Sequence, residues 1–243
     1  MWNRYGEPLT LTEIAASAMF SKFYFSRVFR SSTGVSPGRF LSVIRLHQAK
    51  KRLLETTLNV TNISYEVGYA SLGTFTTRFS RSVGITPSRY RTLSQTGIPL
   101  PTMAPPCMVH PTGAVVGLLN LPETDTPMRV YVGAFESTIP EGAPAACDLL
   151  DSSGPYQLAG LHVGSWYILA IAVAYADVDP RPWKRRPAFV SDPIHVTVSG
   201  GVDVRADIQM RPETPFDLPV LLAVPELDGM QTDDRAPVLQ MVN

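Results

Sequence analysis

Cysteine is scarce in this sequence of 243 residues, which contains only Cys107 and Cys147. The two are far apart, and neither stands at metal-ligand spacing from the other. A pair of reduced thiols is therefore expected rather than a disulfide framework. The sequence also lacks a cleavable signal and any apolar run of the roughly 20 residues that a membrane-spanning helix needs. We expect a soluble cytoplasmic protein with no membrane partner.

Motifs for catalysis and metal binding are missing as well. His110, His162 and His195 occur without HxH or HxxxH spacing, and no Ser or Cys motif marks a nucleophile. We expect structural histidines, no enzyme activity, no metal and no cofactor. Several aromatic residues near the basic run Lys184–Arg186 are either core residues beside a solvated loop or the lining of an effector pocket for an anion. They are Trp166, Tyr167, Tyr175, Trp183 and Phe189.

One pattern occurs twice in the first half of the chain. The run FSRVFRSSTGVSPGRF of Phe25–Phe40 returns as FTTRFSRSVGITPSRY of Phe75–Tyr90, with aromatic, glycine and proline positions at a constant offset. In each copy a short apolar helix pattern comes before a turn and a second helix. Since two helices joined by a tight turn form a helix-turn-helix motif, the repeat predicts two such units.

Capping residues mark the second helix of each unit. Ser21 and Ser71 are the expected N-caps, and Gly34 and Gly84 are placed to end the two helices. Helical spacing turns one apolar group of the first unit inward, namely Phe25, Val28 and Phe29.

A longer helix is predicted from Pro37 to about Thr56, and its apolar residues fall on two faces. Burial on two sides requires two neighbours, so this helix is expected to lie between the two helix-turn-helix units. Its charged residues either form a solvated face or lie near phosphate, and they are Arg45, Lys50, Lys51 and Arg52.

Charge is balanced over the chain but divided between its halves. Residues 1–95 hold 13 Lys and Arg against 4 Asp and Glu, a net charge of +9, and the remainder holds 8 against 17, a net charge of −9. The basic half is suited to phosphate, and the acidic half is repelled by it.

The second half changes from helical spacing to alternation. Residues 94–111 are rich in Thr, Gly and Pro and predict a stiff linker. Residues 112–215 predict a β-sandwich, with apolar runs at Ala114–Leu121, Met128–Phe135, Tyr156–Leu161, Ser165–Ala174, Ile194–Val198 and Val202–Met210. The tail of residues 216–243 opens with the apolar stretch FDLPVLLAVPEL. We expect that stretch to pack within the same chain, with a subunit contact as the alternative.

The runs Ile63–Arg91 (ISYEVGYASLGTFTTRFSRSVGITPSRYR) and Gly34–Thr57 (GVSPGRFLSVIRLHQAKKRLLETT) resemble the DNA-binding domain of AraC/XylS-type transcriptional regulators, over about residues 5–92. The resemblance implies about seven helices, with two recognition helices entering successive major grooves about 34 Å apart. It implies double-stranded DNA as a partner, with RNA polymerase as a further candidate.

The resemblance also assigns roles to individual residues. Positions that reach base edges are Lys22, Phe23, Ser26 and Arg27 in the first unit and Leu72, Gly73, Thr76 and Thr77 in the second. Positions that contact the DNA backbone are Ser21, Arg30, Arg45, Ser71, Thr74, Arg78 and Arg81. Lys and Arg can pair with guanine, so the first unit can read sequence. In the second unit, an arginine common in the family at the place of Thr77 is missing, and Gly73 weakens the helix. That unit is therefore expected to anchor the backbone.

Three further stretches resemble the carboxypeptidase-regulatory-like β-sandwich over about residues 110–211, namely GAVVG of Gly113–Gly117, GPYQL from Gly154 and GLHVGSWY from Gly160. This resemblance implies a structural or interaction role. The predicted chain thus combines an α domain (residues 1–93), a double helix-turn-helix bundle, with an all-β domain, an antiparallel β-sandwich. We expect a sequence-specific DNA-binding transcriptional regulator, with a ligand- or carbohydrate-binding accessory protein as the alternative.

Overall fold

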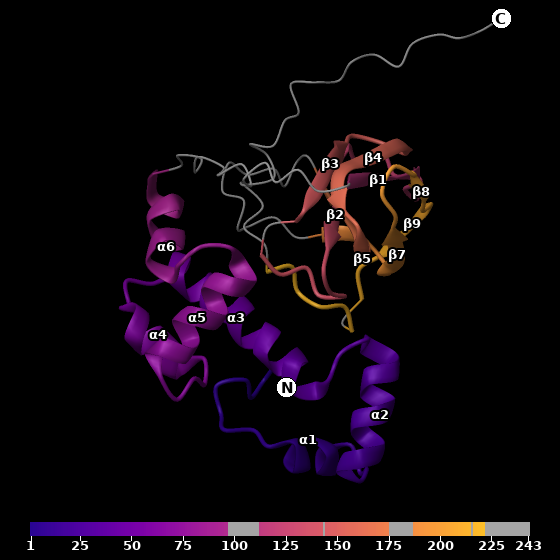
Figure 1. Ribbon diagram of the computed structural model, residues 1–243. Helices are drawn as coiled ribbons and strands as arrows, with labels where there is room; N and C mark the ends of the chain where they lie inside the picture. Colours follow the sequence, from indigo (N-terminus) through magenta and orange to yellow (C-terminus); the bar gives the residue numbers. More distant parts are fainter. Residues whose placement is uncertain (97–111, 143, 175–186, 215, 222–243) are drawn as a thin grey trace, which may run out of the picture.

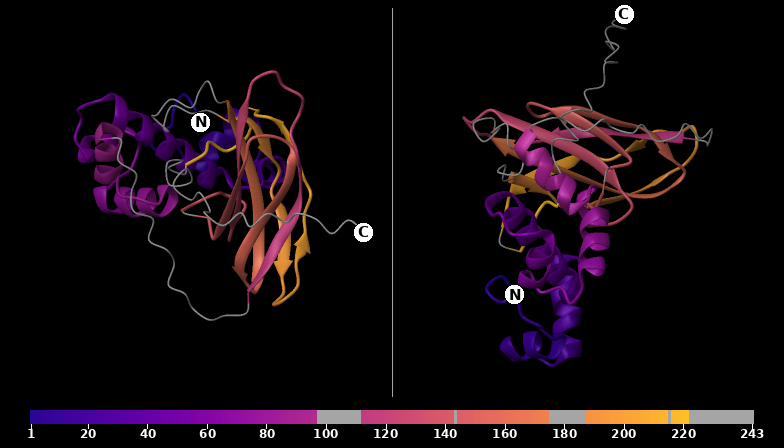
Figure 2. Two further views of the ribbon diagram at one scale, coloured as in Figure 1. Left: turned by 90° about the horizontal axis from the view of Figure 1, so that it is seen from above. Right: turned by 90° about the vertical axis from the view of Figure 1, so that its left-hand side faces the viewer.

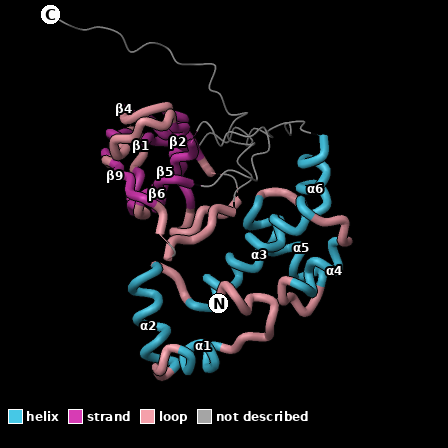
Figure 3. Tube along the Cα trace, turned by 180° about the vertical axis from the view of Figure 1, so that it is seen from behind, coloured by secondary structure: helices cyan, strands magenta, loops and turns pink. Residues whose placement is uncertain are grey.

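The structure is a computed structural model that describes residues 1–96, 112–142, 144–174, 187–214 and 216–221. Helices and strands occupy separate parts of the molecule, a helical part formed by the first half of the chain and a strand-rich part formed by the second (Figure 1). Loops of the strand-rich part extend toward the helices (Figure 3). The predicted linker falls almost entirely outside the described residues, except that helix continues through Thr96.

Six helices lie within the described residues. They are α1 (Leu11–Ser17), α2 (Lys22–Thr33), α3 (Pro37–Glu55), α4 (Val60–Glu66), α5 (Leu72–Val83) and α6 (Pro87–Thr96). The prediction of about seven is therefore wrong by one. Ahead of α1 the chain makes hydrogen-bonded turns, with Arg4 N donating to Met1 O and Glu7 N to Arg4 O, each at 3.1 Å. The capping box of Thr10 and Glu13 then begins α1, so the described residues ahead of this helix form turns.

The predicted caps are confirmed in both units. The Ser21 hydroxyl accepts a hydrogen bond from Tyr24 N, and the Ser71 hydroxyl accepts one from Thr74 N, each at 3.3 Å. Gly34 and Gly84 end α2 and α5 in the left-handed conformation, with φ of 75° and 94°. Local sequence therefore sets the limits of both recognition helices.

Helix α3 is buried on both of its predicted faces and contacts α2, α4 and α6. Its fully buried side chains include Val43, Ile44, Leu46 and Leu53. Of its charged residues, Arg52 pairs with Glu66 on α4 at 2.6 Å, and Lys51 is exposed. Helix α3 thus joins the two units through packing, as the two apolar faces predict.

The two units are buried to different depths. Phe75 and Phe79 of α5 are completely buried, whereas α2 has no buried residue at all. Phe25 and Phe29 are only partly covered, and Val28 is 36% exposed, so the inward placement predicted for Val28 is wrong. The reason is a shortage of neighbours, since α2 packs on the seven-residue α1 and on one end of α3.

Nine strands lie within the described residues of the second part. They are β1 (Thr112–Asn120), β2 (Met128–Phe135), β3 (Ala146–Leu150), β4 (Gly154–His162), β5 (Gly164–Ala174), β6 (Pro187–Ser191), β7 (Ile194–Val198), β8 (Val204–Arg205) and β9 (Ile208–Pro212). The sequence predicts β2 and β7 to the residue, and it misses β3 and β6. The last predicted run, Val202–Met210, is divided between β8 and β9.

The strands make one continuous sheet within the described residues, in the order β3-β2-β5-β6-β9-β1-β4, with β7 also on β5 and β8 on β1. Strand β9 pairs antiparallel with β6 and parallel with β1. Strand β9 joins β6 to β1, and the end strands β3 and β4 contact each other, so the sheet curves into a barrel-like shape (Figure 2). The predicted antiparallel sandwich is therefore not confirmed, and β8 and β9 add parallel pairs to β1.

Inward side chains fill the barrel with one apolar core. Trp166, Ile168, Leu158 and Ile208 are at most 2% exposed and belong to the same cluster. Trp166 also donates its indole hydrogen to His162 O at 3.0 Å. Both observations give Trp166 a place in the core, one of the two alternatives that the sequence leaves open for it.

Two residues of the strand-rich part complete the core of the helical part. Ile139, in the loop between β2 and β3, and Leu221, in the tail, are buried in the same cluster as Phe79 and Tyr90. Lys50 donates to the backbone carbonyls of Val220 and Leu221 at 3.2 and 2.9 Å. The tail therefore packs within its own chain up to Leu221, as expected, and the rest of the predicted apolar stretch lies outside the described residues.

A polar contact near Ile139 joins the two parts as well. The Glu141 carboxylate forms an ion pair with Arg39 and accepts a hydrogen bond from the Ser82 hydroxyl at 3.0 Å. The amide of Gly142 donates to Ser82 O at 3.2 Å. Over the described residues, no helix has the length and apolar character needed to cross a bilayer.

Candidate nucleic-acid interface

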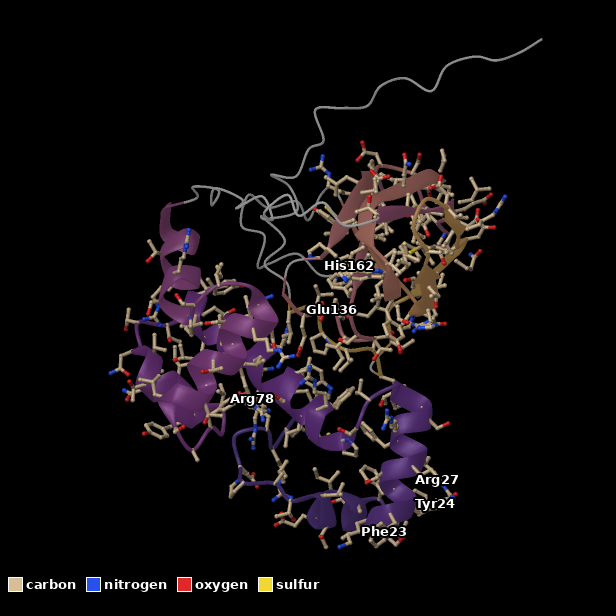
Figure 4. All side chains as sticks on the ribbon, in the orientation of Figure 1. Phe23, Tyr24, Arg27, Arg78, Glu136 and His162 are labelled. Carbon is tan, nitrogen blue, oxygen red and sulfur yellow. The ribbon has the colours of Figure 1, made fainter. Side chains whose placement is uncertain are left out.

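Helix α2 presents charged and aromatic side chains at its N-terminal end. Lys22, Phe23 and Arg27 are all exposed, and Phe23 is exposed by 78%. Ser26 is half-buried. Figure 4 places Phe23, Tyr24 and Arg27 at the end of α2 that lies away from the strand-rich part. This end of α2 is therefore accessible to a large partner.

The cations of α2 contact aromatic rings. Lys22 Nζ lies 5.0 Å from the centre of the Phe23 ring, and the Arg27 guanidinium lies 5.4 Å from that of Tyr24. Phe20 packs edge-on against Tyr24 at 5.0 Å. Within the described residues, neither Lys22 nor Arg27 belongs to an ion pair, so both positive charges are available to a polyanion.

Sequence reasoning missed Phe20 and Tyr24. Tyr24 stands three residues before Arg27, a spacing at which residues are neighbours on a helix, and Phe20 directly precedes the N-cap Ser21. That spacing is a signal that could have identified the group. Tyr24 limits the directions that Arg27 can take and offers a flat face to a base or a sugar.

Helix α5 presents shorter side chains in the matching places. Leu72, Gly73 and Thr77 are exposed, and Thr76 is half-buried. A methyl group added at Gly73 would meet no atom within 4 Å, so this part of the helix surface is open. The hydroxyls of Ser71 and Thr74 bond each other at 2.9 Å at the start of the helix. None of these six side chains carries a charge.

The four arginines predicted at the DNA backbone differ in their surroundings. Arg30 is exposed on α2, and Arg78 is exposed but donates to the Ser42 hydroxyl of α3 at 3.3 Å. Arg45 donates to the carbonyls of Tyr5 and Glu7, each at 2.8 Å, and burial lowers its pKa. Arg81 lines a cleft of about 450 Å³ between the two parts, together with Glu136 and Glu141. Arg45 is therefore occupied on the protein side, whereas Arg81 is exposed.

The strand-rich part shows no catalytic or metal-binding arrangement among its described residues. Over the part of the chain that the structure covers, no three His, Cys, Asp or Glu residues come together as metal ligands. His162 packs on Trp166, and His195 packs on Tyr167. Burial raises the pKa of the Cys147 thiol to about 11. The other predicted residues lie outside the described residues, namely Cys107, His110, Tyr175, Trp183 and Lys184–Arg186.

Two capped helix-turn-helix units on either side of a shared buried helix define a DNA-binding class of fold. The comparisons agree with this class, because the family described as "Helix-turn-helix domain" matches residues 14–92. Residues 14–92 form an AraC-type helix-turn-helix domain, and the relatives that match it are regulators of the AraC family.

Two relatives and one solved structure each resemble about a third to two fifths of this chain. The uncharacterized HTH-type transcriptional regulator YobQ of Bacillus subtilis is 34% identical over 85 residues, which are 35% of this chain and 35% of that protein. The HTH-type transcriptional activator AarP of Providencia stuartii is 37% identical over 89 residues, 37% of this chain and 65% of that protein. The solved DNA-binding domain of AdpA in complex with a target DNA is 28% identical with a TM-score of 0.39, covering 41% of this chain and 90% of that one.

The chain thus spans about a third of the length of the first relative and about two thirds of the other. The family match ends before the linker, so the β domain lies beyond it. The likeness of residues 110–211 to the carboxypeptidase-regulatory-like fold stays a prediction.

Proposed function

We propose that this chain is a sequence-specific DNA-binding regulator of transcription that reads base sequence mainly through α2. The observation that carries the proposal is the difference between the two recognition helices. Helix α2 exposes Lys22, Phe23 and Arg27, whereas α5 exposes Leu72, Gly73 and Thr77. The long cationic side chains of α2 can pair with guanine, whereas Leu72, Gly73 and Thr77 offer only apolar contacts or a single hydroxyl, so base selection falls mainly to α2.

Helix α5 then acts as a backbone anchor. Its capping residues Ser71 and Thr74 lie at a helix N-terminus, where exposed amides attract phosphate. Arg78 supplies positive charge on α5 itself, and Arg30 supplies it on α2. We leave Arg45 out of the DNA contact set, because its guanidinium is bonded to two backbone carbonyls of the protein, and we keep Arg81, which is exposed. RNA polymerase is the further partner that a regulator of this class would need, and no catalytic step is proposed.

Substitution of Arg27 tests the proposal. A binding site is first selected from random duplexes with the purified full chain, and affinities for that site and for random duplex are then measured. Arg27→Ala should cost about 1–3 kcal/mol on the selected site and relax base preference at one position. Thr77→Ala should cost much less.

Arg205→Ala is the matched control, since Arg205 is an exposed arginine on β8 that pairs with Asp207, far from the helices in sequence. It should leave both affinities within twofold. If Arg27→Ala loses the same affinity for the selected and the random duplex, Arg27 touches phosphate only, and α2 does not read base sequence through this residue.

A further inference from the structure

A pocket of about 670 Å³ lies where the helical and strand-rich parts meet. One wall is the end of α2 and the turn into α3, residues 32–35, and the opposite wall is formed by β2, β5 and β6. The third side is the described tail, with Phe216, Leu218 and Val220. Pockets for small organic ligands have volumes of roughly 300–1,000 Å³, so this one has the size of a ligand site.

The strand wall is apolar because β2 and β5 carry apolar residues on both faces. Val132 and Ala170 point into the barrel, so their neighbours Gly133 and Leu169, which pair with each other, point out of it. Tyr131 and Ile171 form the next outward pair. An apolar outer face on a strand is costly in water, and here it is turned toward the pocket.

Gly133 lets other side chains pack on this wall. A methyl group at Gly133 would lie 2.8 Å from the Phe135 ring, closer than carbon atoms approach, so a larger residue would displace that ring. Phe135 and Pro144 occupy the space over Gly133, and both line the pocket. The pocket is thus part of the packed architecture of these strands.

Charged residues at one end of the pocket determine which ligand charge the pocket accepts. Arg211 bonds Asp192 at 2.8 Å and Asp217 at 2.7 Å, and these are the charged groups among the described lining residues. The hydrogen bond from Arg211 lowers the pKa of Asp217, which therefore stays ionised. Two carboxylates on one guanidinium leave a net charge of −1, so an anionic ligand would find the cation occupied and meet repulsion.

We propose that this pocket binds a small, largely apolar molecule of about the size of two or three fused or linked rings, without a negative charge. The contacts are apolar and the ligand touches both the strands and the end of α2. This ligand site is inferred from the pocket alone and does not depend on the proposed DNA binding. The test therefore uses no DNA.

The test compares two fluorescent probes that differ by one sulfonate, titrated into the purified full chain. N-Phenyl-1-naphthylamine is neutral, and 8-anilino-1-naphthalenesulfonate is its anionic counterpart. The neutral probe should bind saturably at one molecule per chain. The anion should bind roughly tenfold more weakly, the factor for like charges about 10 Å apart at an effective dielectric constant of about 20.

Neighbouring serines at the end of α2 locate the bound probe. Ser32 and Ser31 are both exposed, but only Ser32 lines the pocket. Ser32→Trp should therefore reduce affinity for the neutral probe by about tenfold or more, and Ser31→Trp should leave it unchanged. Leu169→Trp, which fills the pocket from the strand side, should reproduce the loss.

Thermal melting of each variant shows that it is folded. Equal affinities of the two serine variants would overturn the proposal, because the probe would then bind elsewhere. Equal binding of the two probes, or the absence of a saturable site for the neutral one, would overturn it as well.

Discussion

At the scale of single residues, Lys50 shows how the helical part and the tail are joined. Its ammonium donates to the carbonyls of Val220 and Leu221 and lies 5.8 Å from the centre of the Tyr90 ring. Burial lowers the pKa of Lys50 to about 7. The folded chain therefore holds this proton less tightly than the unfolded chain, in which a lysine has a pKa of about 10.4.

A pH dependence follows from this difference. Between about pH 7 and pH 10 the unfolded state binds more protons at Lys50 than the folded state, so the free energy of unfolding should rise with pH. The slope from this one group is at most about 1.4 kcal/mol per pH unit. Lys50→Met should flatten the rise between pH 7 and pH 9, measured by urea denaturation.

Lys51→Met is the control, because Lys51 is exposed on the same helix and should leave the slope as it is. If both methionine variants keep the slope of the unmodified chain, the Lys50 ammonium is hydrated in the folded state and its pKa is not lowered.

At the scale of elements, the turn between α2 and α3 fixes the direction of the first recognition helix. Gly34 ends α2 with φ of 75°, a conformation that costs residues with a side chain about 1 kcal/mol. A methyl group there would meet no atom within 4 Å, so the cost of substitution is conformational alone.

Gly34→Ala should lower the free energy of unfolding by about 1 kcal/mol. Gly38→Ala should be neutral or slightly stabilising, since Gly38 has helical geometry near the start of α3 and open space around it. Chemical denaturation of both variants measures the difference. Similar effects of the two substitutions would mean that the turn adjusts its backbone and does not depend on the left-handed residue.

At the scale of the whole molecule, the helical and strand-rich parts form one packed unit. Ile139 and Leu221 enter the helical core, and Glu141 holds Arg39 and Ser82. The proposed ligand pocket and the proposed reading helix meet in α2, whose last turn forms one wall of the pocket. A ligand that favours one position of this turn should therefore change the affinity of the chain for DNA.

Thermodynamic linkage makes this prediction quantitative. Saturating N-phenyl-1-naphthylamine should change the dissociation constant for the selected duplex by roughly fivefold or more, and the duplex should change probe affinity by the same factor. Titrations of each ligand with and without the other measure both factors. If neither ligand changes the dissociation constant of the other, the pocket and α2 act independently, even if each proposed site exists.

Much of the helical part follows from the sequence because its signals act over a few residues. The repeat of Phe25–Phe40 as Phe75–Tyr90, the serine caps and the terminal glycines predict the recognition helices with their limits, and two apolar faces predict the buried position of α3. Alternation likewise predicts most strands. The sequence does not predict strands β3 and β6, because each has five residues with no clear alternation of apolar and polar side chains.

The sequence by itself therefore determined the class of the first domain and the local form of its elements. Only the tertiary structure decided which arginines face solvent, since Arg27 and Arg45 are alike as residues and differ in what folds against them. It also decided how β9 joins β6 to β1, where Leu221 is buried and that a pocket exists. Caps and periodicity depend on neighbours in the chain, whereas these features join residues some 40 to 170 positions apart and depend on the packing of the whole chain.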